Sequence, residues 1–197
     1  MELLNLLNTN EDLTNHCSFH NCFSDDEIET IKSISKNYEM VDGITGNKTN
    51  LSYRKSKVTW LPFNTDTEFI YFKIINFVKA VNDKKWKFNI SNLKDKLQLA
   101  EYNGDESKEE QGHYDFHMDI GNSNMSTRKI SVSIQLTDEN DYEGGDLEIM
   151  TCREVVKAPR EKGTIILFPS YFVHRVTNVT KGQRQSLVLW IHGAPFT

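Results

Sequence analysis

Gly-His-Tyr-Asp-Phe-His-Met-Asp, residues 112–119, places four side chains that can bind a metal ion within seven positions. These side chains are His113, Asp115, His117 and Asp119. If the stretch is a β-strand, side chains two residues apart point to the same face, so all four would lie along one edge. Two His-x-Asp pairs, His113/Asp115 and His117/Asp119, each offer two ligands. Their spacing alone does not decide which pair would bind the metal.

A complete metal site needs a further ligand from elsewhere in the chain, and His174 is the candidate. It lies in Phe-Pro-Ser-Tyr-Phe-Val-His-Arg, residues 168–175. Two imidazoles and one carboxylate are typical ligands of non-haem Fe(II), and they leave coordination positions open. The same three groups would also bind another divalent cation, because ligand type alone does not select iron.

Short strands are predicted on both sides of this stretch. Within residues 129–136, apolar residues alternate with Ser131, Ser133 and Gln135, as the two faces of a strand require. Seven or eight short strands at this spacing are typical of a sandwich or a barrel such as a jelly roll. The predicted strands are 97–102, 113–119, 129–136, 147–150, 154–158, 163–168, 175–178 and 185–192.

The first half of the chain is expected to be mainly helix and loop. Ser24 followed by Glu27 is typical of a capping box at the start of a helix, with Ile28, Ile31 and Ile34 in its buried stripe. Residues 66–83 have helical spacing of apolar side chains. A strand is expected only at 56–61, and residues 42–50 are predicted to form a polar loop.

No linker composition or internal repeat divides the chain, so we expect one domain over residues 1–197. It would comprise a helical support region, 1–95, and a jelly-roll core, 96–197. The predicted fold is therefore mainly β with flanking helices: a double-stranded β-helix (jelly roll) with the amino-terminal helices packed on one sheet.

The composition is that of an ordinary globular protein, with 38% hydrophobic and 26% charged residues and a net charge of −5. The acidic balance disfavours binding to a nucleic-acid backbone. No apolar run is long enough to span a membrane, and the amino terminus lacks the basic region of a secretion signal. We expect a cytoplasmic protein.

The cysteines are few. The chain has three, Cys17, Cys22 and Cys152. This odd, sparse set does not suggest a disulfide framework, which agrees with a reducing compartment. Cys17, His20 and Cys22 offer only three ligands, whereas a structural zinc site needs four, so we do not expect zinc there.

Tyr114-Asp-Phe-His117-Met-Asp119 carries an aromatic residue three positions before a histidine. It resembles the Tyr-x-x-His-x-Asp pattern of 2-oxoglutarate- and Fe(II)-dependent dioxygenases of the prolyl 4-hydroxylase type, including the PKHD-type hydroxylases. This register implies that His117, Asp119 and His174 are the iron ligands. The resemblance continues, over roughly residues 98–192, in Arg128–Ser133, Tyr142–Leu147, Gly163–His174 and Gly182–Leu187. Upstream, residues 54–58 with Trp60 are a weaker match.

The resemblance also implies the cosubstrates. Arg184, ten residues after His174, would anchor the far carboxylate of 2-oxoglutarate, with help from Tyr102 and Ser186. A guanidinium suits this role because it meets a carboxylate with two parallel hydrogen bonds. Many prolyl 4-hydroxylases have Lys at the anchoring position, so Arg places this chain nearer the PKHD-type group. The cofactors implied are Fe(II), 2-oxoglutarate and O2, with ascorbate as a candidate reductant.

The implied activity is hydroxylation of a C–H bond, in a prolyl or other peptidyl residue, with release of succinate and CO2. The expected partner is therefore a peptide or protein. A free amino acid, small metabolite or nucleobase would use the same triad, although a nucleic acid is disfavoured because we find no basic rim. A non-catalytic jelly-roll binding module is the alternative from another class.

Several points stay open from the sequence. His113 and Asp115 are candidates for the substrate entrance, for support of the metal ligands, or for simple solvation. The polar loops 42–50 and 103–112 are candidate lids, because specificity usually lies on loops. Residues 103–112 are acidic, so a lid formed by them would favour a basic peptide over a polyanion. The oligomeric state is undetermined.

Overall fold

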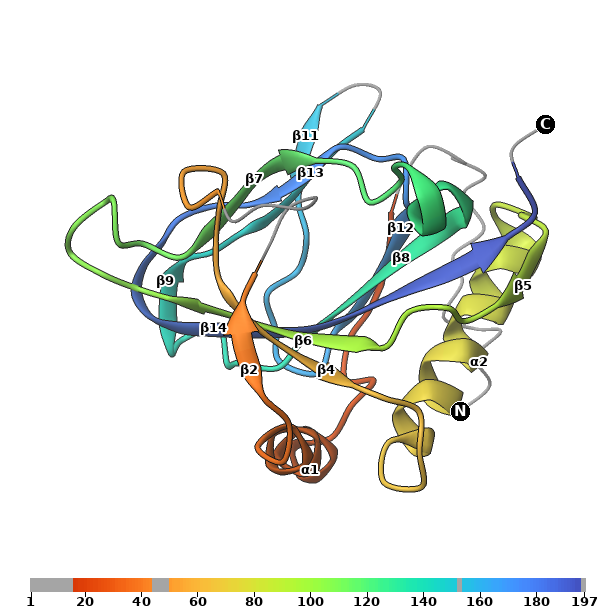
Figure 1. Ribbon diagram of the computed structural model, residues 1–197, viewed down its shortest axis with the longest axis horizontal. Coiled ribbons are helices and arrows are strands. Elements are labelled where there is room, and N and C mark those ends of the chain that lie inside the picture. Colours follow the sequence, from red (N-terminus) through yellow and green to blue (C-terminus); the bar gives the residue numbers. More distant parts are fainter. Residues whose placement is uncertain (1–15, 44–49, 152–153, 196–197) are drawn as a thin grey trace.

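The structure of the protein is a computed structural model that describes residues 16–43, 50–151 and 154–195. Two antiparallel sheets face each other, as in a jelly roll (Figure 1). The large sheet has the order β1 (Cys17–Phe19), β12 (Ile165–Pro169), β8 (Arg128–Gln135), β14 (Val179–Gly193), β6 (Leu97–Asn103), β4 (Lys57–Leu61) and β2 (Met40–Asp42). Two short strands, β5 (Ile90–Asn92) and β9 (Tyr142–Gly144), also pair with β14.

The small sheet carries the decisive stretch of sequence. Its order is β11 (Val155–Lys157), β10 (Leu147–Met150), β13 (His174–Val176), β7 (His113–His117) and β3 (Arg54–Lys55). Strand β7 thus lies between a strand from the carboxyl-terminal part of the chain and one from the amino-terminal part. The 3-10 helix η2 (Ser123–Thr127) follows β7 and leads into β8 of the large sheet.

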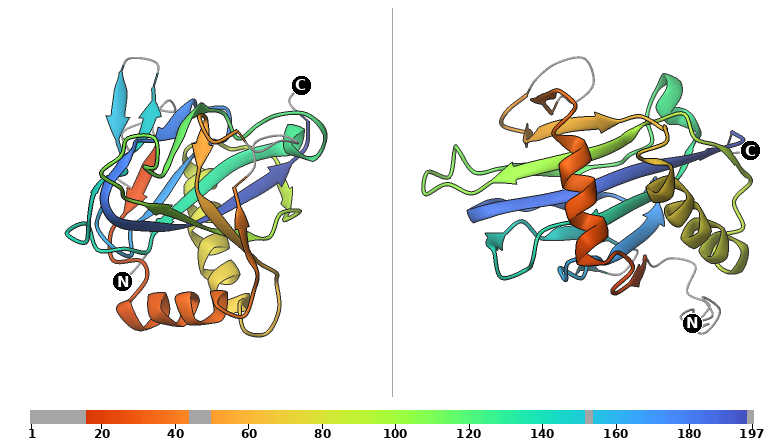
Figure 2. Two further views of the ribbon diagram at one scale, coloured as in Figure 1. Left: turned by 60° about the vertical axis from the view of Figure 1, so that its left-hand side comes forward. Right: turned by 90° about the horizontal axis from the view of Figure 1, so that it is seen from below.

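The two helices, α1 (Asp25–Ser35) and α2 (Glu68–Lys84), cover the outer face of the large sheet. Figure 2 (right) shows α1 crossing the strands of that sheet. Ser24 caps α1 as predicted: its hydroxyl accepts from the Glu27 N–H at 3.2 Å, and the Glu27 carboxylate accepts from the Ser24 N–H at 2.8 Å. The prediction of a jelly roll with amino-terminal helices on one sheet is confirmed.

The central strands of the large sheet separate two environments. Alternate residues of β8, such as Ile130 and Ile134, join the apolar core under the helices. Of the residues between them, Ser133 lines a cavity between the two sheets, and Ser131 on the same face donates to Asp119, which also lines that cavity. Strand β14 behaves in the same way, with Leu187, Leu189 and Ile191 in the core and Arg184, Ser186 and Trp190 in the cavity wall.

The first half of the chain contains more strand than the sequence predicted. In addition to β4, which was expected, β1, β2, β3 and β5 all join a sheet. Each of these strands has only two or three residues, too few to show an alternating pattern. Of the predicted loop 42–50, residues 44–49 lie outside the described part of the chain. Among the described residues, no helix is long and apolar enough to cross a membrane.

Replacing Ser24 with Ala should lower the free energy of unfolding by about 1 kcal/mol, because the first turn of α1 loses a cap. Chemical denaturation of both proteins measures the difference. Thr30→Ala is the matched control, since the Thr30 hydroxyl also bonds to the helix backbone but at an exposed position within α1. Equal losses in the two variants would contradict the capping role.

Candidate active site

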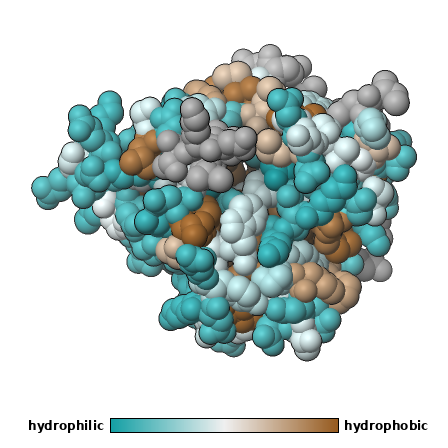
Figure 3. Space-filling view, viewed as in Figure 1, coloured by the Kyte–Doolittle hydropathy of each residue, from teal (hydrophilic) through white to brown (hydrophobic). Residues whose placement is uncertain are grey.

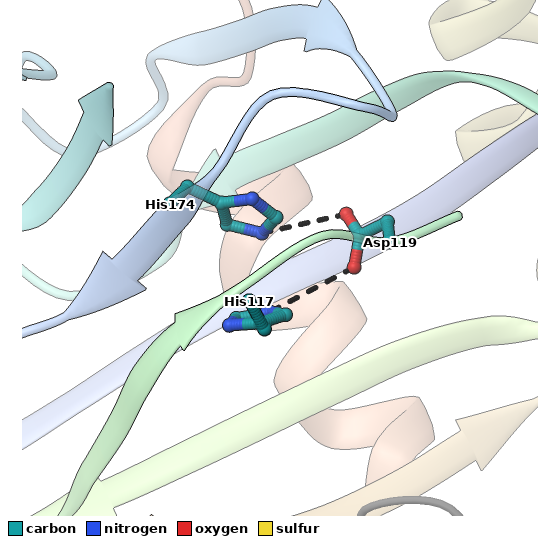
Figure 4. A group of neighbouring side chains, drawn as sticks. All are labelled: His117, Asp119 and His174. Carbon is teal, nitrogen blue, oxygen red and sulfur yellow. Dashed lines mark ion pairs between the residues drawn. The ribbon is translucent and has the colours of Figure 1, made fainter. Parts of the chain in front are cut away.

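Three potential metal ligands converge at one end of the cavity. His117 ends β7, Asp119 follows two residues later, and His174 begins β13, where it pairs directly with His117. An Asp119 carboxylate oxygen lies 3.4 Å from His174 Nε2, and the other lies 3.8 Å from His117 Nε2. The three side chains point toward one another (Figure 4). Within the described residues they are the one His/Cys/Asp/Glu group able to hold a metal ion.

A β-bulge decides which His-x-Asp pair enters the cavity. His174 pairs with His117, but Val176 pairs with Tyr114, so β7 has one more residue than β13 over this segment. The extra residue turns His117 onto the face of Tyr114, and the two rings stack with centroids 3.5 Å apart. The expectation that all four side chains lie along one edge was therefore wrong. A strand with a bulge loses its two-residue alternation.

His113 and Asp115 face a different groove, which they share with Lys55 and Arg175. The His113 ring nitrogens lie 2.9 Å from the Gln111 carbonyl and 3.2 Å from the Ser52 carbonyl. Residues of the loop 103–112 line this groove as well, and none of them lines the cavity that holds the triad.

Both histidines of the triad are oriented for metal binding. Nδ1 of His117 lies 2.7 Å from the Asp115 carbonyl, and Nδ1 of His174 lies 2.9 Å from the Phe172 carbonyl. A carbonyl only accepts, so Nδ1–H donates in each ring, and the Nε2 lone pair is left to face Asp119. Burial, and then the nearby His174, lower the pKa of His117 to about 4, which keeps its ring neutral.

Asp119 is buried and ionised. Burial by itself would raise its pKa, but the neighbouring His174 and His117, together with the Ser131 hydroxyl, hold the pKa below its usual value. Ser131 donates to the Asp119 carboxylate at 2.6 Å. Two imidazoles and one carboxylate in this cluster suit a divalent cation, which would compensate the buried negative charge.

The cavity extends from the triad to Arg184 and has a volume of about 590 Å³. Arg184 is only 1% exposed. Its guanidinium donates to the Gln135 side-chain carbonyl at 3.0 Å and to the Ser186 hydroxyl at 3.3 Å, and its Nε has no hydrogen-bond partner among the described residues. A buried cation with neutral partners and an unused donor fits a ligand carboxylate.

Comparison with known proteins agrees with this geometry. Residues 97–192 match the 2OG-Fe(II) oxygenase superfamily. These residues contain His117, Asp119, His174 and Arg184. In sequence, residues 97–192 are therefore similar to this superfamily.

Curated relatives of this chain are named PKHD-type hydroxylases. One from Synechococcus sp. (strain CC9311) is 41% identical over 83 residues, which cover 42% of this chain and 38% of the relative. Another, from Teredinibacter turnerae, is 36% identical over 85 residues and is also covered over 38% of its length. The chain thus matches less than two fifths of each of these relatives.

The fold is shared with solved prolyl hydroxylases. A prolyl hydroxylase from Trichoplax adhaerens, solved with a hypoxia inducible factor oxygen degradation domain peptide fragment, superposes with a TM-score of 0.75 at 20% identity. The superposition covers 96% of this chain and 87% of that one. A Pseudomonas putida prolyl-4-hydroxylase has a TM-score of 0.71 at 14% identity, covering 91% and 92%. At these identities the likeness concerns the fold.

The other two predicted site residues are Tyr102 and Ser186. Both lie at the Arg184 end of the cavity. Tyr102 is buried, and the Arg184 guanidinium carbon lies 5.6 Å from the centroid of its ring. Strand pairing places Arg184 directly opposite Tyr102 on β6. Ser186 is two residues further along β14 and accepts a hydrogen bond from Arg184. The structure therefore brings all six predicted site residues to one cavity.

The sequence analysis did not identify the residues that support Asp119. The Ser131 and Ser170 hydroxyls lie 3.0 Å apart, and since Ser131 donates its one proton to Asp119, Ser170 donates to Ser131. The Asp119 N–H donates to the Ser170 carbonyl at 3.0 Å. One signal was available: Ser131 belongs to the polar face of a strand whose other face is apolar.

No zinc cluster forms at Cys17, His20 and Cys22 in this described part of the chain. The Cys22 thiol lies 3.1 Å from the Phe19 carbonyl, and burial raises its pKa to about 11. His20 instead lies 3.7 Å from the Glu161 carboxylate.

Ser131→Ala should weaken divalent-metal binding about tenfold, because Asp119 loses the hydrogen bond that orients its carboxylate. Isothermal titration calorimetry with Mn²⁺ measures the change in Kd. Ser133→Ala on the same strand is the matched control, since Ser133 lines the cavity but is not a hydrogen-bond donor to Asp119. An unchanged Kd in Ser131→Ala would rule out the supporting role.

Proposed function

We propose that this protein is an Fe(II)- and 2-oxoglutarate-dependent dioxygenase that hydroxylates a C–H bond and releases succinate and CO2. One observation carries the proposal: a buried cluster of two histidines and an aspartate shares one cavity with a buried arginine that has only neutral partners. The two ends of the cavity have opposite charge requirements, a cation at the triad and a carboxylate at Arg184.

The roles of the side chains follow from their positions. His117, Asp119 and His174 would hold the iron, and Arg184 would pair with the far carboxylate of 2-oxoglutarate. When bound, the iron and 2-oxoglutarate supply the oxidative chemistry, in which O2 provides one oxygen atom to succinate and one to the substrate. Gln135 and Ser186 fix the guanidinium of Arg184, so little reordering is needed when a carboxylate arrives.

The walls of the cavity orient the cosubstrate and exclude water. Tyr102 and Ser186 would lie beside the far carboxylate as further hydrogen-bond donors. Val132, Val188 and Phe168 make the middle of the cavity apolar, which strengthens the charge interactions at both ends.

We infer that the substrate is a prolyl or other peptidyl residue. The curated relatives are named hydroxylases, and a structural neighbour was solved with a peptide. Two exposed side chains, Met118 and Met125, line the cavity, and flexible methionines suit contact with a polypeptide. We also propose a cytoplasmic location, because the free thiols of Cys17 and Cys22 agree with a reducing compartment. We further propose that the chain forms a single domain.

The acidic loop 103–112 lies beside the neighbouring groove. It projects at the left in Figure 1, where Figure 3 shows mainly hydrophilic side chains. Lys55 of β3 holds it through the Glu110 carboxylate and through the Glu109 carbonyl, the latter at 3.1 Å. We therefore propose that the loop contacts segments of a peptide that extend beyond the cavity and prefers basic ones.

Arg184→Gln should raise the KM for 2-oxoglutarate at least about 30-fold, because a buried charge pair with the far carboxylate is worth about 2 kcal/mol or more. Succinate formation by the iron-loaded protein, with 2-oxoglutarate and oxygen, measures this change.

His174→Ala should abolish turnover while the protein stays folded.

The matched control is Arg160→Gln. Arg160 also lies over an aromatic ring, Tyr142, and pairs with Asp146 at 3.1 Å, but it does not line the cavity. This control should keep the wild-type KM. No succinate from wild-type protein that demonstrably holds iron would favour a non-catalytic binding module.

The substrate class is tested separately. Proline-containing peptides should stimulate succinate formation, and mass spectrometry should find a gain of one oxygen atom on the peptide. Stimulation by free amino acids but by none of the peptides would contradict the peptidyl assignment and leave the dioxygenase assignment intact.

A further inference from the structure

Behind the cavity wall lies a buried network that the proposed reaction does not use directly. A single carboxylate oxygen of Asp95, in the bend between β5 and β6, receives three donors. They are Nε and Nη2 of Arg128 and Nε2 of His192, each at 2.9 Å. Three donors on one oxygen define the orientation of both donor side chains closely.

His192 is fully buried, at 0% exposure. Its Nε2 must carry the proton, because the ionised Asp95 carboxylate only accepts. Nδ1 of the ring lies 2.9 Å from the Thr127 hydroxyl, with which it shares a hydrogen bond. Both ring nitrogens are satisfied, so the ring is held in one orientation.

Strand register brings His192 and Arg128 together. Along β14, Ile191 pairs with Ile130 of β8, but His192 pairs with Arg128, so β8 has an extra residue at Lys129. In a regular pair, Lys129 would lie opposite His192. Because of the bulge, Arg128 lies there instead. The side chains of Arg128 and His192 are thus brought together by the pairing of the two longest strands.

The network ends on the backbone of a proposed metal ligand. Nη1 of Arg128 donates to the Asp119 carbonyl at 3.2 Å. The guanidinium carbon lies 3.9 Å from the centroid of the Trp190 ring, and both side chains line the cavity. Arg128 therefore connects Asp95 and His192 to the segment that carries Asp119.

A purely stabilising role explains this arrangement poorly. A buried ion pair contributes little net stability compared with apolar residues of the same volume, because both charges lose their hydration. What the network does supply is a fixed direction for one N–H of Arg128. That direction matters at Asp119, whose carboxylate must be held close to two imidazoles.

We propose that Asp95 and His192 are positioning residues of the metal centre: they hold Arg128 so that it fixes the Asp119 backbone. The proposal rests on the metal centre of the proposed function. It predicts that loss of either residue weakens metal binding even though neither contacts the metal. Residues that support metal ligands in this way commonly change metal affinity by about 10-fold or more.

The test is anaerobic titration with Co²⁺, a spectroscopic substitute for Fe(II), followed by visible absorption. Asp95→Asn and His192→Phe should each raise the Kd for Co²⁺ about tenfold. His192→Gln should return the Kd towards the wild-type value, because its amide nitrogen can again donate to Asp95. Thermal unfolding of each variant measures the accompanying loss of stability.

Glu27→Gln is the matched control. Glu27 pairs with Lys73 at 2.6 Å, and Lys73 lies over the ring of Phe23, so the control also breaks an ion pair beside an aromatic ring. It does so on the helices, outside the cavity. This variant should lose stability and keep the wild-type Kd for Co²⁺.

The outcomes separate the two proposals. Wild-type protein that fails to bind Co²⁺ overturns the metal centre and this inference together. Wild-type protein that binds Co²⁺, with binding lost in His174→Ala, supports the metal centre. An unchanged Kd in His192→Phe then overturns the positioning role alone. If Asp95→Asn does not fold, the contrast between His192→Phe and His192→Gln decides the question.

Discussion

The pairing of β7 with β13, including its one extra residue, is the constraint on which the site depends. It places His117 directly opposite His174, although the two residues are far apart in the chain. Without the bulge, His117 would share the face of His113 and Asp115, which points to the neighbouring groove. Stacking of Tyr114 on His117 occupies the space that the bulge opens and fixes the ring plane. The proposed metal ligands are therefore brought together by an irregular strand pair.

A second requirement is the separation of environments by the large sheet. Its central strands send apolar residues toward the helices and polar ones toward the cavity. Asp119 and Arg184, both buried, occupy opposite ends of the polar side. Each buried charge costs free energy unless a partner of opposite charge is present. The fold thus contains two incompletely compensated charges, and a cation and a carboxylate ligand would complete them.

The support of Asp119 combines residues from several parts of the chain. Ser131 of β8 orients the carboxylate, the Ser170 backbone accepts from its N–H, and Arg128 donates to its carbonyl. Asp95 and His192 reach the same ligand through Arg128. A short segment after β7, which has no strand pairing of its own, is in this way held by hydrogen bonds to neighbouring segments.

The sequence by itself determined the helix cap at Ser24, most strands of the second half and the set of candidate ligands. Those features depend on neighbours within a few residues, so capping patterns and alternation reveal them. The order of motifs, by resemblance, also selected His117 and Asp119. Only the tertiary structure decided that β7 is bulged, that short strands such as β1 and β3 join the sheets, and that Asp95 and His192 meet Arg128. These outcomes depend on pairing between residues distant in the chain, and a local pattern carries no information about the partner strand.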